Sequence, residues 1–349
     1  MKENVKRVFY VRQVAHPCYL DIIAKRPEIR LDKLANDSSE EAAAPIMSAA
    51  HAYQIGSARD ELNPRFHMRA ELLARMPKLL IVSTTGAGYD TVNVKDCTDA
   101  GVLVVNQTGG NAEAVATHVV AMVIALSKQI VQTNHALRQG SMHDRNAFVG
   151  TDVRGKTIGI FGLGNVGRRV ANLCGTLLGM TVIACDPYLD APTMRERGAE
   201  KVEADELLRR ADFVSINCPL DDGSRGMIGA REFALMKPSA YFINTARGFI
   251  HDERALADAL RDKKLAGAGV DVFDKEPPPK EHPLLAFDNV IASPHMAGVT
   301  YEARANMGKI AAEQMIMMLD GKRPPRMVNP QVWPVYCKRF EETFGMRPE

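Results

Sequence analysis

Three polar residues in the second half of the chain have side chains suited to proton transfer next to a carboxylate: Arg247, Glu276 and His295. A guanidinium binds a carboxylate through two parallel hydrogen bonds and polarises an adjacent carbonyl. A histidine exchanges a proton near neutral pH, and a nearby glutamate orients the imidazole and stabilises its charged form. We therefore predict that all three residues are catalytic, with His295 as the general acid/base.

Each residue also has an ordinary structural interpretation. An arginine after a strand is usually a surface ion-pair residue, a glutamate before a proline is usually part of a turn, and a histidine after a proline is often a loop donor. The catalytic interpretation is favoured because all three follow a pattern typical of dinucleotide binding.

That pattern is Gly162-Leu-Gly164-Asn165-Val166-Gly167, which follows an apolar β-branched run and precedes a helical stretch. Gly162 permits a tight turn, Gly164 lets the backbone approach a pyrophosphate, and Gly167 lets helix and strand pack closely. The amides of Asn165 and Val166 are expected to face the phosphates at the start of the helix.

A carboxylate is expected to select the cofactor. Asp186 ends the next strand, where it can accept hydrogen bonds from ribose hydroxyls and repel a 2′-phosphate. The following residues, 187–189, offer no cation for such a phosphate, so the sequence favours NAD over NADP. The alternative is that Asp186 is only a turn residue before Pro187.

Composition limits the class of protein. The chain has 349 residues, 46% apolar and 25% charged, with a net charge of +2, which suits two soluble domains and does not suggest a nucleic-acid partner. No signal peptide or membrane span is expected, because the apolar region around 115–126 is interrupted and too short. The six scattered cysteines are expected to be reduced packing residues in a cytoplasmic protein without a bound metal.

The elements that position these residues follow from hydrophobic periodicity. Strands are expected at 9–11, 52–55, 79–83, 102–106, 157–161, 182–185, 213–216, 241–243, 269–272 and 290–292. Helices are expected at 19–26, 69–76, 111–140 and 301–319, and the tail beyond Asn329 is expected on the surface without a chemical role. This alternation predicts an α/β fold with two Rossmann-like domains and doubly wound parallel sheets. The three chemical residues then follow strand ends, where open parallel sheets bind ligands.

Between about 78 and 330 the sequence resembles the D-isomer-specific 2-hydroxyacid dehydrogenases, in a short form similar to hydroxypyruvate/glyoxylate reductases and phosphoglycerate dehydrogenases. The segments that carry the resemblance are 161–168, 242–248 with Asp252-Glu253, 269–277 and 293–298. The resemblance implies hydride transfer between NAD and a small D-2-hydroxy acid or its 2-keto acid. It assigns the substrate carboxylate to Arg247, the proton to His295, and the support of His295 to Glu276.

The resemblance also implies two binding sets. The loop 85–90 is similar to one whose amides receive the substrate carboxylate, here at Gly86, Ala87 and Gly88. Asp271 is expected to contact the nicotinamide amide. The full implied cofactor set is Gly162, Gly164, Asn165, Val166, Gly167, Asp186, Cys218, Pro219, Ser224, Thr245, Ala246, Asp271, His295 and Gly298.

The domain boundaries expected from the resemblance make one domain discontinuous. Residues 1–110 with 300–349 form a flavodoxin-like substrate-binding domain, and residues 111–299 form the NAD-binding Rossmann domain. A homodimer built on the cofactor domain is expected. A non-enzymatic NAD-sensing protein, similar to corepressors of the same fold, is the alternative function.

Two positions depart from the family pattern. Thr84 stands where the phosphoglycerate branch has an arginine, which disfavours a phosphorylated substrate unless Arg59 supplies the cation. His251 stands where an apolar residue is usual, and is expected to be either a solvated loop residue or a substrate contact. Glyoxylate, hydroxypyruvate, and branched, aromatic or larger polar keto acids all remain open, as does the physiological direction.

Overall fold

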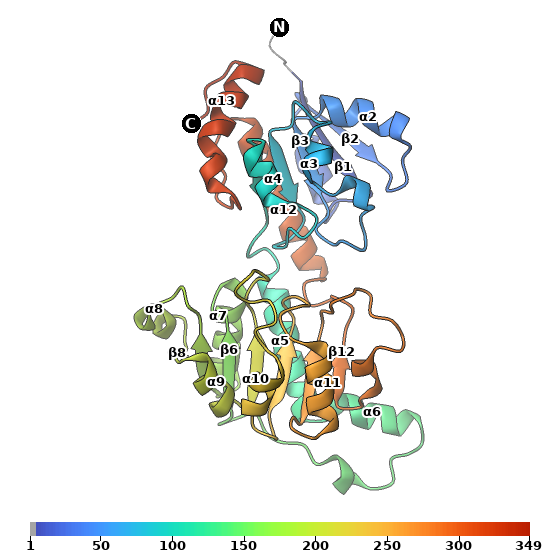
Figure 1. Cartoon of the computed structure of the whole chain (residues 1–349), viewed down its shortest axis with the longest axis vertical. Coiled ribbons are helices and arrows are strands. Elements are labelled where there is room, and N and C mark those ends of the chain that lie inside the picture. The colour runs from blue at the N-terminus through green and yellow to red at the C-terminus, as the bar shows by residue number, and fades with distance from the viewer. Residues whose placement is uncertain (1–4) are drawn as a thin grey trace. The chain divides into compact units, whose positions relative to one another are not determined.

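The computed structural model describes residues 5–349 and is shown in Figure 1. Contacts divide the chain into two compact units, Met1–Asn111 with Thr300–Glu349, and Ala112–Val299. Each unit is a parallel sheet covered by helices, so the predicted α/β fold with doubly wound sheets is confirmed.

The first unit contains a five-stranded parallel sheet in the order β2-β1-β3-β4-β5, which is a flavodoxin-like order. Its strands are β1 (Lys6–Val11), β2 (Ile29–Leu34), β3 (Ala52–Ile55), β4 (Ile81–Thr84) and β5 (Leu103–Val105). Its helices are α1 (Cys18–Ile23), α2 (Glu40–Ala49), α3 (Ala70–Leu73), α4 (Val94–Asp99), α12 (Tyr301–Leu319) and α13 (Trp333–Phe344).

Alternate strand residues supply two cores, one on each face of this sheet. Phe9, Tyr53 and Val82 pack on one face, in a cluster that also contains Ala43 and Met47 of α2. The neighbouring residues on each strand pack on the other face, against α1, α12 and α13. The long helix α12 therefore returns the chain to the unit in which it began.

Strand β2 was not predicted. It lies at the edge of the sheet and pairs only with β1. Its sequence, IRLDKL, is buried mainly at its two ends and carries charged side chains between them. An edge strand needs fewer apolar residues than a central one, so the β-branched run that marks central strands is missing here.

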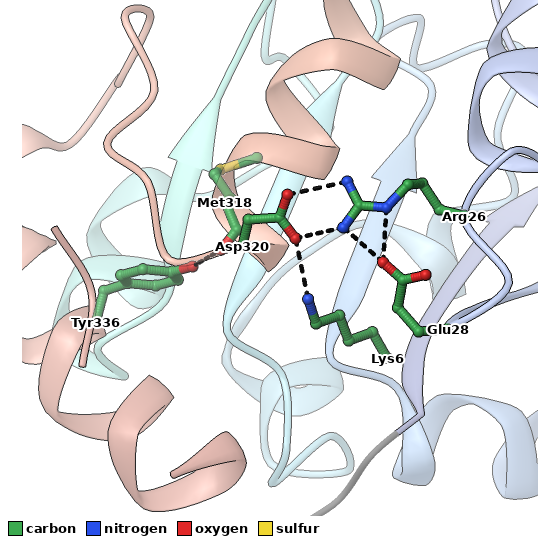
Figure 2. A network of polar contacts seen from close by, with 6 residues as sticks. All are labelled: Lys6, Arg26, Glu28, Met318, Asp320 and Tyr336. Carbon is green, nitrogen blue, oxygen red and sulfur yellow. Dashed lines mark hydrogen bonds and ion pairs between the residues drawn. The ribbon is translucent and has the colours of Figure 1, made fainter. Parts of the chain in front are cut away.

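The tail was expected on the surface, and this expectation was wrong, whereas its lack of a chemical role stays a prediction. Helix α13 packs on the core, because Tyr336, Phe340 and Phe344 recur at helical spacing and are all buried. The Tyr336 hydroxyl donates to the Met318 carbonyl at 2.5 Å, which ties α13 to the end of α12 (Figure 2). The aromatic spacing was visible in the sequence, and it indicates a core-facing helix.

A charged network also holds the end of α12 against the sheet (Figure 2). Asp320, which follows α12, accepts from Lys6 Nζ at 3.1 Å and from Arg26 Nη2 at 2.6 Å. Arg26 also donates to Glu28 at 2.6 Å. Burial alone raises the pKa of Asp320, but Arg26 and Lys6 lower it by a larger amount. The pKa therefore lies below its usual range, and the carboxylate stays ionised.

The second unit contains a seven-stranded parallel sheet in the order β12-β11-β10-β9-β6-β7-β8. Its strands are β6 (Thr157–Phe161), β7 (Thr181–Cys185), β8 (Glu200–Lys201), β9 (Phe213–Ile216), β10 (Tyr241–Asn244), β11 (Gly267–Val270) and β12 (Val290–Ala292). Its helices are α5 (Ala112–Ser127), α6 (Ile130–Arg138), α7 (Asn165–Asn172), α8 (Ala191–Glu196), α9 (Ala204–Arg210), α10 (Ala230–Leu235) and α11 (Glu253–Arg261). The short edge strand β8 was not predicted.

The single helix predicted over 111–140 is two helices, α5 and α6, bent by 61°. Gln129, between them, has a left-handed backbone with φ of 51°. No proline or glycine marks this break, so the sequence pattern did not reveal it. Within residues 5–349, no helix is long and apolar enough by itself to cross a bilayer; only this bent pair together meets those criteria.

Candidate active site

The three residues predicted to be catalytic follow three neighbouring strands of the second unit. Arg247 follows β10, Glu276 follows β11 and His295 follows β12, and these strands are adjacent in the sheet. The carboxyl ends of adjacent parallel strands lie at one edge, so this topology gathers the three loops. All three residues belong to one compact unit.

Glu276 and His295 form a direct pair. His295 Nδ1 lies 2.8 Å from Glu276 Oε2, and Glu276 Oε1 accepts from the Phe273 amide at 3.0 Å. An ionised carboxylate can only accept, so Nδ1 carries the proton of this bond. Nε2 is therefore the ring nitrogen available to give or take a proton. The His295 side chain is 42% exposed, so substrate can reach it.

Glu276 and His295 also shift each other's pKa. Partial burial lowers the pKa of His295, but the hydrogen bond and negative charge of Glu276 outweigh that effect and raise it above its ordinary value. Burial raises the pKa of Glu276, but His295 and the Phe273 amide bring it below its usual range. The histidine is therefore more readily protonated than a free imidazole.

Arg247 follows β10, the neighbour of β11, and its charge lowers the pKa of both Glu276 and His295. Arg247 Nη1 donates to the Ala246 carbonyl at 2.6 Å. The structure thus brings the predicted cation, proton carrier and carboxylate to one edge of the sheet.

A buried aspartate holds the loop that carries His295. Asp271 is fully buried and accepts from Ser293 Oγ at 2.6 Å and from the amides of Met296 and Ala297 at 2.7 and 2.9 Å. Its carbonyl accepts from the His295 amide at 2.7 Å. Sequence reasoning missed this supporting role, and the nicotinamide contact assigned to Asp271 stays a prediction.

A second histidine supports the same loop from α5. His118 Nε2 lies 3.1 Å from Ser293 Oγ, whose hydroxyl donates to Asp271. In the sequence His118 is only a polar interruption of the apolar region around 115–126. Its position in the second turn of α5 gave no signal that it reaches a strand-end loop.

The loop that carries Arg247 and the loop that carries Glu276 are joined by hydrogen bonds. The Phe249 amide donates to Asp274 Oδ1 at 2.6 Å, and the Asp274 amide donates to Glu253 Oε1 at 2.9 Å. Glu253 Oε2 lies 3.0 Å from His282 Nε2. A Cβ on Gly248 would collide with the Phe273 carbonyl, so only glycine allows the two loops to approach this closely.

The glycine-rich turn has the geometry of a phosphate cradle. Gly162 has φ of 83°, and a Cβ there would lie 2.9 Å from the Cys218 nitrogen. A Cβ on Gly167 would meet the Gly162 carbonyl, whereas a Cβ on Gly164 would enter open space. Helix α7 begins at Asn165 without a side-chain cap, so its first amides remain available to a phosphate.

Asp186 lies beside this turn. Its Oδ2 accepts from the Leu163 amide at 2.9 Å, and its Oδ1 accepts from the Tyr188 amide at 3.0 Å. Each carboxylate oxygen keeps a lone pair that can accept from a ribose hydroxyl. The role predicted for Asp186 is therefore compatible with its position.

Two buried polar atoms along the same edge have no hydrogen-bond partner within residues 5–349: Asn217 Oδ1 and Thr245 Oγ1. Buried polar groups are rarely left unpaired, so these atoms fit a site for a polar ligand. Asn217 follows β9, which neighbours β6 and its glycine-rich turn, and Thr245 follows β10, the next strand along. The residues present here therefore fit a dinucleotide.

Other residues of the predicted cofactor set shape the surrounding loops. Ser224 Oγ donates to the Pro219 carbonyl at 2.7 Å and accepts from the Asp221 amide at 2.9 Å. Burial raises the pKa of the Cys218 thiol to about 12, so it stays neutral. Ala246 donates its amide to Asn244, and Gly298 follows the loop held by Asp271. Across residues 5–349 no cluster of three or more metal-binding side chains is found.

In the first unit, Gln107 and Asn106 form hydrogen bonds to the predicted substrate loop, 85–90. The Gly86 amide donates to Gln107 Oε1 at 2.7 Å, and the Gly86 carbonyl accepts from the Gln107 amide at 2.8 Å. Asn106 Nδ2 donates to the Ala87 carbonyl at 2.9 Å. The Gly86 amide is thus already used, and the binding of a substrate by Gly86, Ala87 and Gly88 stays a prediction.

The two departures from the family pattern have different positions. The Thr84 side chain is fully buried in the first unit, whereas Arg59 is exposed and its Nε donates to the Asp90 carbonyl at 2.8 Å. Arg59 therefore lies at the end of the substrate loop. His251 is buried, with 1% exposure, so the expectation of a solvated loop residue was wrong.

Comparison with known proteins agrees with these observations. A family model described as D-isomer specific 2-hydroxyacid dehydrogenase, NAD binding domain, matches residues 120–297. A glyoxylate reductase from Aeropyrum pernix is 35% identical over 333 residues, covering 93% of this chain and 96% of that protein. A crystal structure of a glyoxylate reductase from Paecilomyes thermophila superimposes with a TM-score of 0.83 at 26% identity, covering 94% of this chain and 99% of that one.

A D-3-phosphoglycerate dehydrogenase from Archaeoglobus fulgidus is 37% identical over 260 residues, which is 74% of this chain. The chain spans only 49% of the length of that relative.

The chain belongs to the D-isomer specific 2-hydroxyacid dehydrogenase family, and residues 120–297 match its NAD-binding domain. The family resemblance drawn from the sequence motifs is confirmed, as is NAD as the cofactor. The chain is accordingly an NAD-dependent oxidoreductase of this family.

Proposed function

We propose that this protein interconverts a small D-2-hydroxy acid and its 2-keto acid, with Arg247, Glu276 and His295 as the catalytic residues. The observation that carries the proposal is the His295–Glu276 pair, at 2.8 Å, on the ligand-binding edge of an NAD-binding sheet. The nearby charge of Arg247 supplies the carboxylate anchor that such a substrate needs.

In the reductive direction, Arg247 holds the substrate carboxylate and thereby places the adjacent carbonyl at His295. Protonated His295 donates from Nε2 to the carbonyl oxygen, while Glu276 holds Nδ1–H and stabilises the imidazolium before transfer. Bound NADH supplies the hydride to the carbonyl carbon. In the oxidative direction, neutral His295 accepts the hydroxyl proton at the same nitrogen.

The amides of Ala87 and Gly88 are proposed as a substrate-binding set of the first unit. Gln107 binds the amide and the carbonyl of Gly86, and Asn106 binds the Ala87 carbonyl, which leaves the Ala87 and Gly88 amides available. A small unphosphorylated acid is proposed because Thr84 is buried and offers no cation. The relative named glyoxylate reductase, which aligns over 96% of its length, supports this substrate class.

The test of this function is NADH oxidation against a panel of 2-keto acids. The panel includes glyoxylate, hydroxypyruvate, branched and aromatic keto acids, and phosphohydroxypyruvate, with NADPH run in parallel. Turnover of an unphosphorylated keto acid is expected. Tight NADH binding without turnover of any keto acid would contradict the proposal and favour a non-enzymatic NAD-sensing protein.

Replacing Glu276 by glutamine is expected to shift the pH dependence of reduction. Glu276 raises the pKa of His295, and reduction needs the protonated imidazole, so activity is lost as pH rises through that pKa. In Glu276→Gln the pKa falls, and reduction fails at a lower pH than in the wild type. The measurement is kcat/KM for keto-acid reduction across pH, and an unshifted profile would argue against the pairing.

Replacing Asp186 by serine is expected to weaken the discrimination between the two cofactors. The Asp186 carboxylate beside the Leu163 amide repels a 2′-phosphate, so its removal is expected to improve kcat/KM for NADPH relative to NADH by about ten-fold or more. Comparing kcat/KM for NADH and NADPH in both proteins measures this effect. An unchanged ratio would assign Asp186 to the turn alone.

A homodimer is proposed, with α6 and the segment after it in the interface. Ile130, Val131, Leu137 and Val149 are 50%, 42%, 70% and 70% exposed, although they are apolar. Three of these residues lie on α6 and one in the segment after it, and exposed apolar side chains that gather on one surface are typical of a surface that another chain covers. Leu137→Asp with Val149→Asp is expected to give a monomer in analytical ultracentrifugation. The wild type sedimenting as a monomer at micromolar concentration would refute the proposal.

A cytoplasmic location is also proposed. All six cysteines are free thiols, and a reducing compartment maintains that state.

A further inference from the structure

A histidine is buried directly behind the arginine loop. His251 is 1% exposed and forms an isolated parallel bridge with Ile228. Its ring lies 5.2 Å from the ring of Phe242, in the main core of the second unit. An apolar side chain would fill this position without introducing polar atoms, so the imidazole requires a specific explanation.

The imidazole contacts the loop through Asn244, the last residue of β10. Asn244 Nδ2 lies 3.0 Å from His251 Nδ1 and donates to the Arg247 carbonyl at 2.9 Å. Asn244 Oδ1 accepts from the Ala246 amide at 2.9 Å. One fully buried side-chain amide therefore makes three contacts and spans the turn that carries Arg247.

Only one arrangement of hydrogens satisfies all three contacts. The Ala246 amide can only donate, so the Asn244 oxygen must face it, and the Asn244 nitrogen must face the other two groups. The two hydrogens of that nitrogen go to the Arg247 carbonyl and to His251 Nδ1. His251 Nδ1 is therefore an acceptor, and the ring proton is on Nε2.

The other ring nitrogen, His251 Nε2, makes no hydrogen bond that would stabilise the fold within the described residues. This nitrogen is buried, and a buried donor without an acceptor is unfavourable. The ring atom that accounts for a histidine here is thus Nδ1, and its contact leads to Arg247.

The charge state of the ring agrees with this role. Burial lowers the pKa of His251 to about 4, while the charges of Glu253 and Asp252 oppose that shift and His282 adds to it. The imidazole therefore stays neutral, and its Nδ1 stays an acceptor, throughout the range in which His295 titrates.

We propose that His251 is a positioning residue for Arg247. Its Nδ1 holds one hydrogen of the Asn244 amide, which directs the other hydrogen to the Arg247 carbonyl and fixes the backbone from which the guanidinium projects. This inference rests on the proposed function, in which Arg247 binds the substrate carboxylate. It predicts a defect in keto-acid binding without a matching defect in NADH binding.

Three variants separate this role from general packing. His251→Leu keeps an apolar shape but removes the acceptor, whereas His251→Asn can return an acceptor oxygen near the Nδ1 position. Ile250→Val removes one methylene from the neighbouring core position and leaves Asn244 untouched. All three are compared with the wild type for KM and kcat, with the 2-keto acid and NADH varied separately.

His251→Leu is expected to raise KM for the 2-keto acid about ten-fold, with KM for NADH changed less than about two-fold. His251→Asn is expected to recover most of this loss, and Ile250→Val is expected to leave both KM values near those of the wild type. Equal effects of leucine and asparagine, or a parallel loss for both substrates, would overturn the proposal. So would an unchanged keto-acid KM in His251→Leu.

If the wild type turns over no keto acid, the proposed function is refuted, but the position of His251 is still open to test. A spectroscopic measurement then tests the inference directly. Protein labelled with ¹⁵N-histidine and ¹⁵N-glycine is recorded by NMR between about pH 5.5 and 8.5. The expected spectrum shows His251 protonated on Nε2 and not titrating. The Gly248 amide, which follows the Arg247 carbonyl, is expected to shift in His251→Leu and not in His251→Asn. An Nδ1–H tautomer, or a Gly248 signal unaffected by leucine, would overturn the inference.

Discussion

His295→Gln is expected to reduce turnover by about 10²–10⁴-fold, because glutamine cannot donate a proton from the position of Nε2. Glu276 holds the wild-type ring at 2.8 Å, and the His295 backbone amide donates to the Asp271 carbonyl, so the substitution removes the proton without removing the loop's backbone support. NADH binding is expected to change little, since the glycine-rich turn and Asp186 lie elsewhere in the sheet.

The measurement for His295→Gln is kcat for keto-acid reduction, together with NADH affinity from fluorescence. Retained NADH binding with lost turnover is the expected pattern. Turnover close to that of the wild type would show that another group supplies the proton. Loss of NADH binding and turnover together would point to a disturbed fold, which circular dichroism would reveal.

Arg247→Gln is expected to reduce kcat/KM for the 2-keto acid on the order of 10²–10³-fold, because a charged anchor for the substrate carboxylate is lost. Glutamine keeps a hydrogen-bond donor of shorter reach but no charge. The Asn244 bond to the Arg247 carbonyl involves the backbone and is retained. Most of the loss is therefore expected from the missing guanidinium.

A second effect of Arg247→Gln follows from the electrostatics of the site. The Arg247 charge lowers the pKa of His295, so its removal is expected to raise the pH at which reduction fails. This shift is opposite in direction to that of Glu276→Gln. Matching shifts in the two variants, or an unchanged kcat/KM in Arg247→Gln, would contradict the assigned positions of the charges.

The sequence predicted the central elements because these carry strong local patterns. Strands such as β6 and β10 are mostly apolar, and the glycines around Gly162 mark a turn with few alternative explanations. The weakly patterned elements were missed. The edge strand β2 carries charged residues, so it lacks the apolar run of a central strand. The break at Gln129 contains no proline or glycine, so the sequence does not mark it.

For the site, residue type and position after a strand led to the prediction of Arg247, Glu276 and His295, and the structure places the three after neighbouring strands. Supporting contacts were not visible, because they depend on partners that are far away in the sequence. Asp271 holds the His295 loop and Gln107 occupies the Gly86 amide, yet neither role has a local pattern. His251 was noticed only because its type departs from an apolar expectation.

The most direct test of the central claim compares the pH dependence of both reaction directions on the same substrate pair. If His295 carries the proton, kcat/KM for reduction falls above one pKa, and kcat/KM for hydroxy-acid oxidation falls below the same pKa. That pKa is expected above the ordinary value for histidine. Mirror-image profiles sharing one pKa would support the account, whereas profiles that fall in the same direction, or do not depend on pH, would contradict it.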